Sequence, residues 1–215
     1  MLAGWLRIKG GVYTYIEKIL TRFSGNIILN AKVESVQRKT NEVIIHWNNR
    51  EQSFDKIIFA TPPDQILPLL KQPSTTEQTI LKDWKANKAQ TVIHTDAQIY
   101  QRFNISAPSP FDFFETLDGW GYNACLNNLC EVTNKTSYFL SYNLESLIEP
   151  NKIISRHHHL TPFYTVDTFQ ARQELINLNG ANHTCFVGAY LGDGLHEGAV
   201  MSAKKVIQLF SQYSA

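Results

Sequence analysis

The end of the chain predicts a buried strand, a glycine-rich turn and a long helix in immediate succession, and this order most limits the available folds. The strand signature covers 184–188, the turn 189–198 and the helix 199–213. Glycines let a turn approach a ligand closely, and a helix start offers N–H donors with a partial positive charge. We expect an anion or an electron-rich ring edge to be stabilised there.

A second buried strand is predicted at 54–60, which ends in a continuous apolar run. Such a run is typical of a strand that is covered on both faces of a sheet. Thr61-Pro62-Pro63 ends the strand, because proline has no amide hydrogen and restricts the residue before it, and a helix over 64–70 follows. A strand that ends at a helix start is a natural ligand edge. Both units favour an α/β fold.

The remaining elements are predicted from weaker patterns. A helix follows Gly10-Gly11 and ends before Gly25-Asn26, and 168–178 reads as a helix that Asn179-Gly180 ends. The segment 106–110 is predicted to be a loop. Strands are predicted at 27–29, 33–38, 43–47, 91–94, 122–126 and 138–142. From residue 91 onward, strands separated by polar turns indicate a second lobe.

Composition excludes several classes of protein. The 215 residues are 43% hydrophobic and 18% charged, which permits a sizeable core. Lys and Arg total 20 against 19 for Asp and Glu, so nucleic acid is not an expected partner. No apolar run is long enough to span a membrane, and the start of the chain is too short for a signal peptide. We expect a cytoplasmic protein.

Cysteine usage agrees with a reducing compartment. Cys125, Cys130 and Cys185 are odd in number and form no CxxC pair. We therefore expect three thiols that pack as small hydrophobic side chains rather than a disulfide framework.

Three segments, taken in their order along the chain, carry a family resemblance. They are 9–20, then 29–36 together with 57–62, and finally 186–203. Together they resemble the flavin-containing amine oxidase superfamily, which includes phytoene-desaturase-like and protoporphyrinogen-oxidase-like enzymes. Within it, 92–96 and 190–197 resemble predicted NAD/FAD-binding proteins with a Rossmann-like fold. The likeness spans nearly the whole chain.

The resemblance implies FAD as the cofactor, held by residues from separate parts of the chain. Val33 would offer backbone hydrogen bonds to the adenine end. Ala60 and Thr61 would lie near the diphosphate or ribose. Gly188 and Ala189 would face the ribityl chain.

The resemblance also assigns the flavin ring to the start of the last helix. His196 and Glu197 would present a main-chain N–H to the pyrimidine edge, while Gly198 and Ala199 would allow close approach. A positive helix end there would favour reduction, because reduced flavin gathers negative charge on that edge. The candidate cofactor residues of this turn are Tyr190, Gly194, His196, Glu197, Gly198 and Ala199.

One part of the family pattern is missing from this sequence. Members begin with a strand followed by GxGxxG, whose amides face the cofactor's pyrophosphate, and no such motif occurs here. Gly10-Gly11 does not replace it. The chain would then be a piece of a longer protein, one half of a split gene or a degenerate remnant. We expect a missing N-terminal segment or a partner chain to carry the dinucleotide-binding loop.

Catalytic residues are harder to assign. His94 and Asp96 share a face if 91–96 is a strand, so they could handle a proton near the flavin. They could equally form a structural hydrogen bond. Hydride transfer to flavin often depends on the cofactor's own electronics and orientation more than on acidic or basic side chains. No Ser-His-Asp or nucleophile-elbow pattern supports a hydrolase.

Two further clusters allow more than one interpretation. The tract His157-His158-His159 does not predict a metal site, because neighbouring side chains in an extended chain point to alternate sides. A polar loop is preferred for it, and a cavity lining is the alternative. The aromatic residues could line an apolar substrate pocket or pack in the core; they are Phe111, Phe113, Phe114, Trp120 and Tyr122.

The sequence therefore predicts an α/β protein of mixed α+β character with two interwoven parts. Residues 1–86 and 181–215 would form an incomplete FAD-binding Rossmann-like lobe, and 87–180 a mixed β-sheet substrate lobe with helices. The expected activity is that of an FAD-dependent oxidoreductase, which oxidises a small organic amine or desaturates a carbon–carbon bond. The alternative is a non-catalytic interaction module, or a half-subunit that binds FAD only with a partner.

Overall fold

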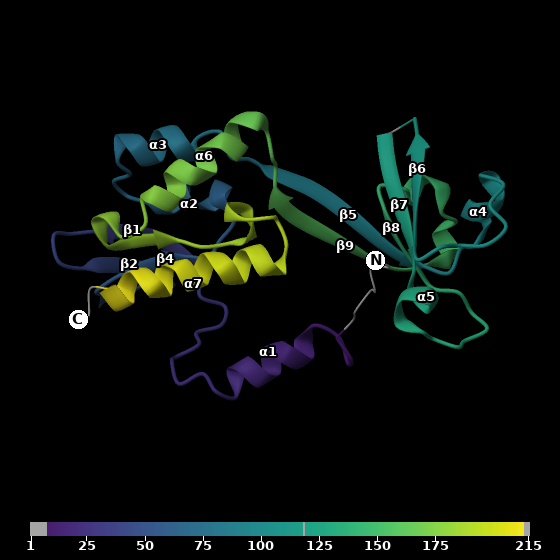
Figure 1. Cartoon of the computed structure of the whole chain (residues 1–215), viewed down its shortest axis with the longest axis horizontal. Coiled ribbons are helices and arrows are strands. Elements are labelled where there is room, and N and C mark those ends of the chain that lie inside the picture. Colours follow the sequence, from purple (N-terminus) through teal and green to yellow (C-terminus); the bar gives the residue numbers. More distant parts are fainter. Residues whose placement is uncertain (1–7, 118, 213–215) are drawn as a thin grey trace.

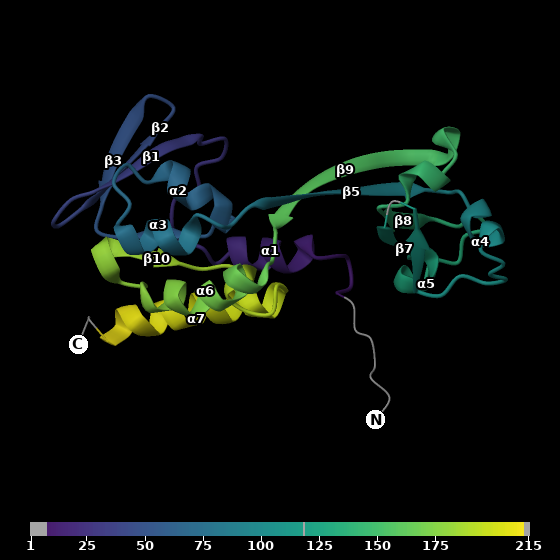
Figure 2. The ribbon, with the colours of Figure 1, turned by 90° about the horizontal axis from the view of Figure 1, so that it is seen from above.

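The molecule consists of two bodies joined by a pair of long antiparallel strands (Figure 1). The computed structural model describes residues 8–117 and 119–212. β5 (Ala86–His94) leads out of the first body and β9 (Ile153–Pro162) leads back into it. Figure 2 shows the two strands running side by side between the bodies. The predicted α/β class with mixed α+β character is confirmed.

The first body contains two small sheets and most of the helices. A meander of β1 (Val33–Arg38), β2 (Val43–Trp47) and β3 (Arg50–Phe54) is antiparallel. β4 (Ile57–Phe59) pairs in parallel with β10 (Thr184–Phe186). The helices of this body are α1 (Tyr13–Leu20), α2 (Ile66–Leu69), α3 (Thr75–Leu81), α6 (Val166–Asn177) and α7 (His196–Gln212).

Helices pack against both faces of β10 and against one face of β4. Phe59 and Phe186 stack with ring centroids 5.9 Å apart and belong to a core that also includes Leu81 of α3 and Leu175 of α6. Cys185 points the other way and packs with Val206 of α7. β10 therefore has two buried faces, as its apolar run predicts, whereas β4 has only one, because Ile58 is 46% exposed.

A buried ion pair ties the first body together. Arg38 of β1 donates through Nη2 to Glu77 Oε2 at 2.8 Å, and both side chains are almost wholly buried. Glu77 also completes a capping box with Ser74 at the start of α3. Burial alone would raise the pKa of Glu77, but hydrogen bonds from Arg38 and Ser74 outweigh it and hold this pKa below its usual value.

The second body is built on one antiparallel sheet of five strands. Their order is β6-β7-β8-β5-β9, with β6 (Phe111–Thr116), β7 (Gly119–Cys125) and β8 (Phe139–Tyr142) outside the connecting pair. One face packs against α4 (Gln98–Arg102) and the loop after β8. α5 (Leu126–Cys130) follows β7 at the end of the sheet.

Both predicted apolar strands form, but β4 covers only part of the predicted 54–60 and its Ile58 is 46% exposed. Four other predictions were wrong. Residues 27–29 form no strand, because no neighbouring segment pairs with them. The histidine tract lies within β9 rather than in a loop, because β5 supplies its hydrogen-bonding partner. The last helix begins at His196 rather than at 199, while Tyr213 at its predicted end lies outside the described residues. Cys130 is exposed, whereas Cys125 and Cys185 are buried as expected.

Candidate functional site

An open cleft lies where the parallel strands β4 and β10 end. Both strands finish at the same edge, so the residues that follow them meet there. The cleft has a volume of about 430 Å³. Six residues predicted from the sequence line it: Ala60, Thr61, Gly188, Ala189, Tyr190 and Gly194.

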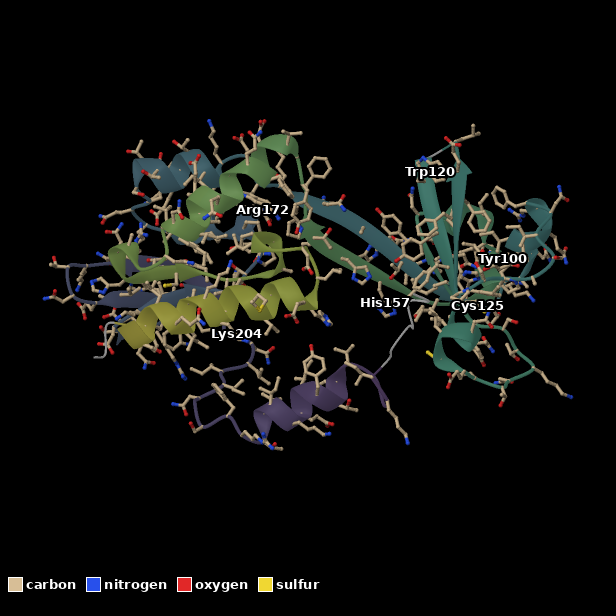
Figure 3. The ribbon with its side chains drawn as sticks, in the orientation of Figure 1. Tyr100, Trp120, Cys125, His157, Arg172 and Lys204 are labelled. Atoms are coloured by element: carbon tan, nitrogen blue, oxygen red, sulfur yellow. The ribbon has the colours of Figure 1, made fainter. Side chains whose placement is uncertain are left out.

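The backbone at Gly188 shapes one wall of the cleft. Its φ of 155° is one that other residues rarely adopt, and a Cβ atom here would lie 2.5 Å from the Tyr190 ring. The Gly188 N–H donates to Ser202 Oγ of α7 at 2.9 Å, which anchors the turn to the helix. Arg172 of α6 holds the next part of the turn by donating to the Gly192 carbonyl oxygen (Figure 3).

Aromatic side chains back the cleft. Trp84 contacts both Tyr164 and Tyr190 edge to face, at centroid distances of 5.9 and 5.6 Å. Burial raises the pKa of Tyr190 far above its usual value, and burial also raises the pKa of Tyr164. Both phenols are therefore neutral hydrogen-bonding groups near neutral pH.

Polar atoms without a partner gather around the cleft. Among the described residues, Thr61 Oγ1 and Tyr190 Oη are buried and have no hydrogen-bond partner, and Asp64 Oδ1 nearby is in the same state. A buried polar group without a partner costs free energy, so such atoms commonly mark a place where a ligand or water binds. Thr61 and Tyr190 line the cleft itself.

A second cavity lies beside the cleft, on the side of β1. It has a volume of about 550 Å³ and is lined by residues that include Val33, Asp64 and Thr61. Because Thr61 lines both cavities, the two are neighbours. Val33 lines this second cavity and not the cleft itself.

A third cavity lies beside the cleft, over the connecting strands. Its volume is about 480 Å³. Asn87 of β5 and Thr161 of β9 line both this cavity and the cleft. Tyr122 and Tyr142 lie on its floor, stacked at a centroid distance of 5.5 Å. We call it the sheet cavity.

The start of α7 is organised mainly by Asp193. Its Oδ1 accepts hydrogen bonds from the N–H groups of Leu195 at 2.8 Å and Gly198 at 3.1 Å. This carboxylate offsets part of the positive helix end. The first N–H groups of a helix have no partner within it, so His196 and Glu197, both exposed, offer the donors that a ligand could meet.

The four predicted residues at this helix start lie in different surroundings. His196 and Glu197 are exposed, Ala199 is half-buried, and none of the three lines the cleft. Gly198 is buried, and a Cβ there would lie 2.4 Å from Asp193 Oδ1. Close packing inside the turn is thus one reason for glycine at 198, independent of any ligand.

His94 and Asp96 lie in the second body, away from the cleft. Both are almost fully buried and line none of the three cavities. His94 Nε2 is 2.8 Å from Ser141 Oγ, and Nδ1 accepts from the Asp96 N–H. The Asp96 carboxylate accepts from the N–H groups of Gln98 and Glu149. Burial lowers the pKa of His94. This geometry favours the structural alternative, and a catalytic role stays a prediction.

The histidine tract alternates across β9. His157 and His159 share the face that carries Thr91, and His159 Nε2 is 2.8 Å from Thr91 Oγ1. His158 pairs with Gln90 and lies on the other face. Within the described ranges no cluster of three potential metal ligands forms.

Comparison of the structure with solved structures finds a similar fold in a fatty acid isomerase and in two oxidases. A fatty acid isomerase from P. acnes aligns over 93% of this chain with a TM-score of 0.66 and 11% identity. A putrescine oxidase variant with a redesigned cofactor site aligns over 94% with a TM-score of 0.65 and 10% identity. A proposed protoporphyrinogen oxidase from Exiguobacterium sp. 255-15 aligns over 94% with a TM-score of 0.61 and 15% identity.

The chain spans about half the length of these proteins, covering 52%, 53% and 52% of them respectively. At these identities the likeness concerns the fold alone. No family model matches the sequence, and no curated protein matches it. None of the helices in the described part of the chain is both long and apolar enough to cross a membrane.

Several residues around the cleft are absent from the sequence-based prediction. Asn87, Thr161 and Tyr164 reach it only because β5 and β9 pair, with Asn87 opposite Thr161. That pairing joins distant segments and leaves no local pattern. Trp84 lies two residues before the start of β5, and it belongs to no sequence motif that could have predicted its place behind the cleft.

Proposed function

We propose that this chain forms part of the FAD site of an oxidoreductase resembling flavin-containing amine oxidases, which oxidises a small organic substrate. The observation that carries the proposal is the set of three neighbouring cavities, in which the cleft shares Thr61 with the cavity beside β1 and Asn87 and Thr161 with the sheet cavity. FAD is an elongated molecule, and a row of neighbouring cavities with substrate space at one end suits it.

The positions of Val33, Thr61 and Gly188 in neighbouring cavities support the cofactor placement that the family resemblance implies. Val33 lies in the first cavity, where the adenine end would bind. Thr61 lies at the junction, where its unpartnered hydroxyl would donate to a diphosphate or ribose oxygen. Gly188 and Ala189 border the central cleft, where the ribityl chain and ring would lie.

The polarity of the residues in the cleft suits this cofactor. Bound flavin would accept a hydride from the substrate and carry the two electrons away. Tyr190 would offer a neutral hydroxyl, and the glycine-rich turn would let the backbone approach closely. The aromatic residues behind the cleft would exclude water from this side of the reaction space.

The absorbance of the purified chain tests this proposal. We expect flavin bands in the protein as isolated, or after FAD is added together with a chain that carries a strand and GxGxxG loop. Heat denaturation should release the flavin into solution. A colourless protein under both conditions would contradict the proposed FAD site.

A specific observation favours the half-subunit as the second candidate. The β4–β10 sheet has only two described strands, and Ile58 of β4 is 46% exposed although it lies beside buried Cys185. Val200 and Ile207 of α7 are also exposed. A parallel sheet is normally covered on both faces, so these surfaces suit a further strand and helix.

Mixing experiments separate the two candidates. If the chain needs a partner, flavin bands should appear only when the GxGxxG-bearing chain is present, and both chains should elute together in gel filtration. An Ile58→Lys substitution should prevent that association, whereas Ile44→Lys on the separate meander should not. Flavin retention by the isolated chain would favour the enzyme without a required partner.

A further inference from the structure

One wall of the sheet cavity is the face of the five-stranded sheet that no described helix covers. In the five-stranded sheet, direct register partners form a row across all strands: His157, Thr91, Tyr142, Tyr122 and Phe113. Because direct partners share a face, these side chains all lie on the same side of the sheet. The opposite face is the packed one, with Phe139 in the core.

The uncovered face is rich in aromatic surface. Phe113 is 69% exposed and Trp120 is 63% exposed on the outer hairpin (Figure 3). Phe113 and Tyr122 have ring centroids 6.0 Å apart, and Tyr122 stacks on Tyr142. The uncovered face of an antiparallel sheet usually carries polar side chains, so contiguous aromatic surface here indicates a binding role.

The walls of the sheet cavity and the adjoining cleft contain no Asp, Glu, Lys or Arg among the described residues that line them. Their polar groups are hydroxyls, amides and one imidazole, that of His159. Burial, and to a lesser extent the neighbouring Tyr142, raises the pKa of Tyr122, so this phenol remains uncharged. An ionised ligand here would lose hydration without gaining an opposite charge.

We propose that the sheet cavity binds the uncharged, predominantly apolar part of the substrate, and that it selects neutral molecules against ammonium ions and carboxylates of the same size. This inference rests on the proposed function, because it takes the cavity beside the cleft as the substrate space. It names the substrate class of that space: an apolar chain or ring system that stacks on Tyr122 and Tyr142, with a hydroxyl or carbonyl that could bond to Thr91 or Asn87.

Three probes of equal length and different charge test the inference on this chain. They are n-octanol, octylammonium and octanoate, titrated calorimetrically below the concentrations at which they form micelles. Octanol should bind at least about tenfold more tightly than either ion, because only the ions lose hydration uncompensated. Equal affinities, tighter binding of octylammonium or no binding of any probe would overturn the proposal.

A charge placed in the cavity should reverse this selectivity. Leu140→Glu puts a carboxylate on the cavity wall, and it should raise the affinity for octylammonium by about tenfold while weakening octanoate. Leu160→Glu is the matched control, because Leu160 is exposed on the opposite face of β9 and lines no cavity. If circular dichroism shows that Leu140→Glu is unfolded, Thr91→Asp provides the same test. Unchanged selectivity in a folded cavity variant would overturn the proposal.

Titration of the same preparations with FAD separates this inference from the proposed function. Octanol selectivity in a preparation that binds no FAD supports the neutral substrate class and counts against the cofactor site. FAD binding without charge selectivity supports the cofactor site and overturns the substrate class.

Discussion

At the scale of single residues, the cleft differs from the protein core in how its polar atoms are satisfied. His94 has a partner at each ring nitrogen, whereas Thr61 Oγ1 has none among the described residues. A satisfied buried group stabilises the fold, and an unsatisfied one is available to a ligand. Substitution of His94 should therefore change the stability of the fold, whereas substitution of Thr61 should change ligand binding.

Substitution of Thr61 should weaken cofactor binding without a loss of stability. Thr61→Val removes a buried hydroxyl that bonds to no described protein atom, so the free energy of unfolding should stay the same or rise. FAD affinity should fall by about tenfold, because a hydrogen bond to a charged or polar cofactor oxygen is lost. Urea denaturation and FAD titration measure the two effects. Thr79→Val on α3, outside the cavities, is the control, and an equal loss of affinity there would contradict the assignment.

Substitution of His94 should change the pH dependence of stability. The folded-state pKa of His94 is lowered by burial, so below its ordinary pKa of about 6.5 the unfolded chain binds a proton that the folded chain does not. Stability should therefore fall as the pH is lowered through that value. His94→Gln should reduce this slope between about pH 7.5 and pH 5.5 in urea denaturation. Parallel pH curves for both proteins would exclude the proposed linkage.

At the scale of elements, the turn between β10 and α7 is held by contacts within the chain as much as by its glycines. Gly188 has a backbone conformation that favours glycine, Gly192 lies against Gly198, and Asp193 accepts two N–H groups at the helix start. Together these contacts fix the conformation of the turn that forms one wall of the cleft.

A methyl group at Gly188 should destabilise the turn. Gly188→Ala combines an unfavourable φ of 155° with a Cβ placed 2.5 Å from the Tyr190 ring, and we expect a loss of about 1–3 kcal/mol in unfolding free energy. Gly119→Ala is a control with positive φ, at 106°, but open space around its Cβ. Equal losses in the two variants would show that the Tyr190 contact costs nothing.

Asp193 allows its charge to be separated from its capping role. Asp193→Ala should destabilise the protein by about 1 kcal/mol, because Leu195 and Gly198 lose their acceptor. Asp193→Asn keeps an acceptor and removes the charge, so it should retain stability and make the reduction potential of bound flavin more positive. Spectroscopic titration measures the potential. A more negative potential in Asp193→Asn would contradict placement of the ring near this helix start.

The elements that the sequence predicted are those whose pattern is local. β4 and β10 have continuous apolar runs, and Thr61 and Gly188, which follow them, line the same cleft. α3 was missed although Ser74 and Glu77 form a capping box that could have revealed it. β9 could not be predicted because its polar sequence is extended only through pairing with β5. The same pairing brings Asn87 and Thr161 to the cleft.

At the scale of the whole molecule, packing is uneven. No residue from Ile8 to Leu29 is buried, and Leu29 is 78% exposed, whereas β10 is buried throughout. α1 contacts α7 only lightly, with the Tyr15 and His196 rings 6.3 Å apart. Local stability follows burial, so the segment 8–29 should be the least stable part of the described chain.

Hydrogen exchange should reveal this difference. In the isolated chain, amides of α1 should exchange fast and those of β10 slowly. If a chain with the GxGxxG loop completes the molecule, its addition should slow exchange in α1, because the exposed apolar side chains of that segment would be covered. Exchange in β6 serves as an internal reference. Strong protection of α1 in the isolated chain would contradict the packing described here.

The parallel pairing of β4 with β10 also has a consequence for biosynthesis. One strand lies near residue 58 and the other near residue 185, so the cleft between them cannot close until the residues of β10 have left the ribosome. Pairing over such a separation has a large loop-closure cost and is slow. Until β10 is synthesised, the apolar side chains of β4 stay exposed. Aggregation and chaperone binding are therefore most favoured at this stage.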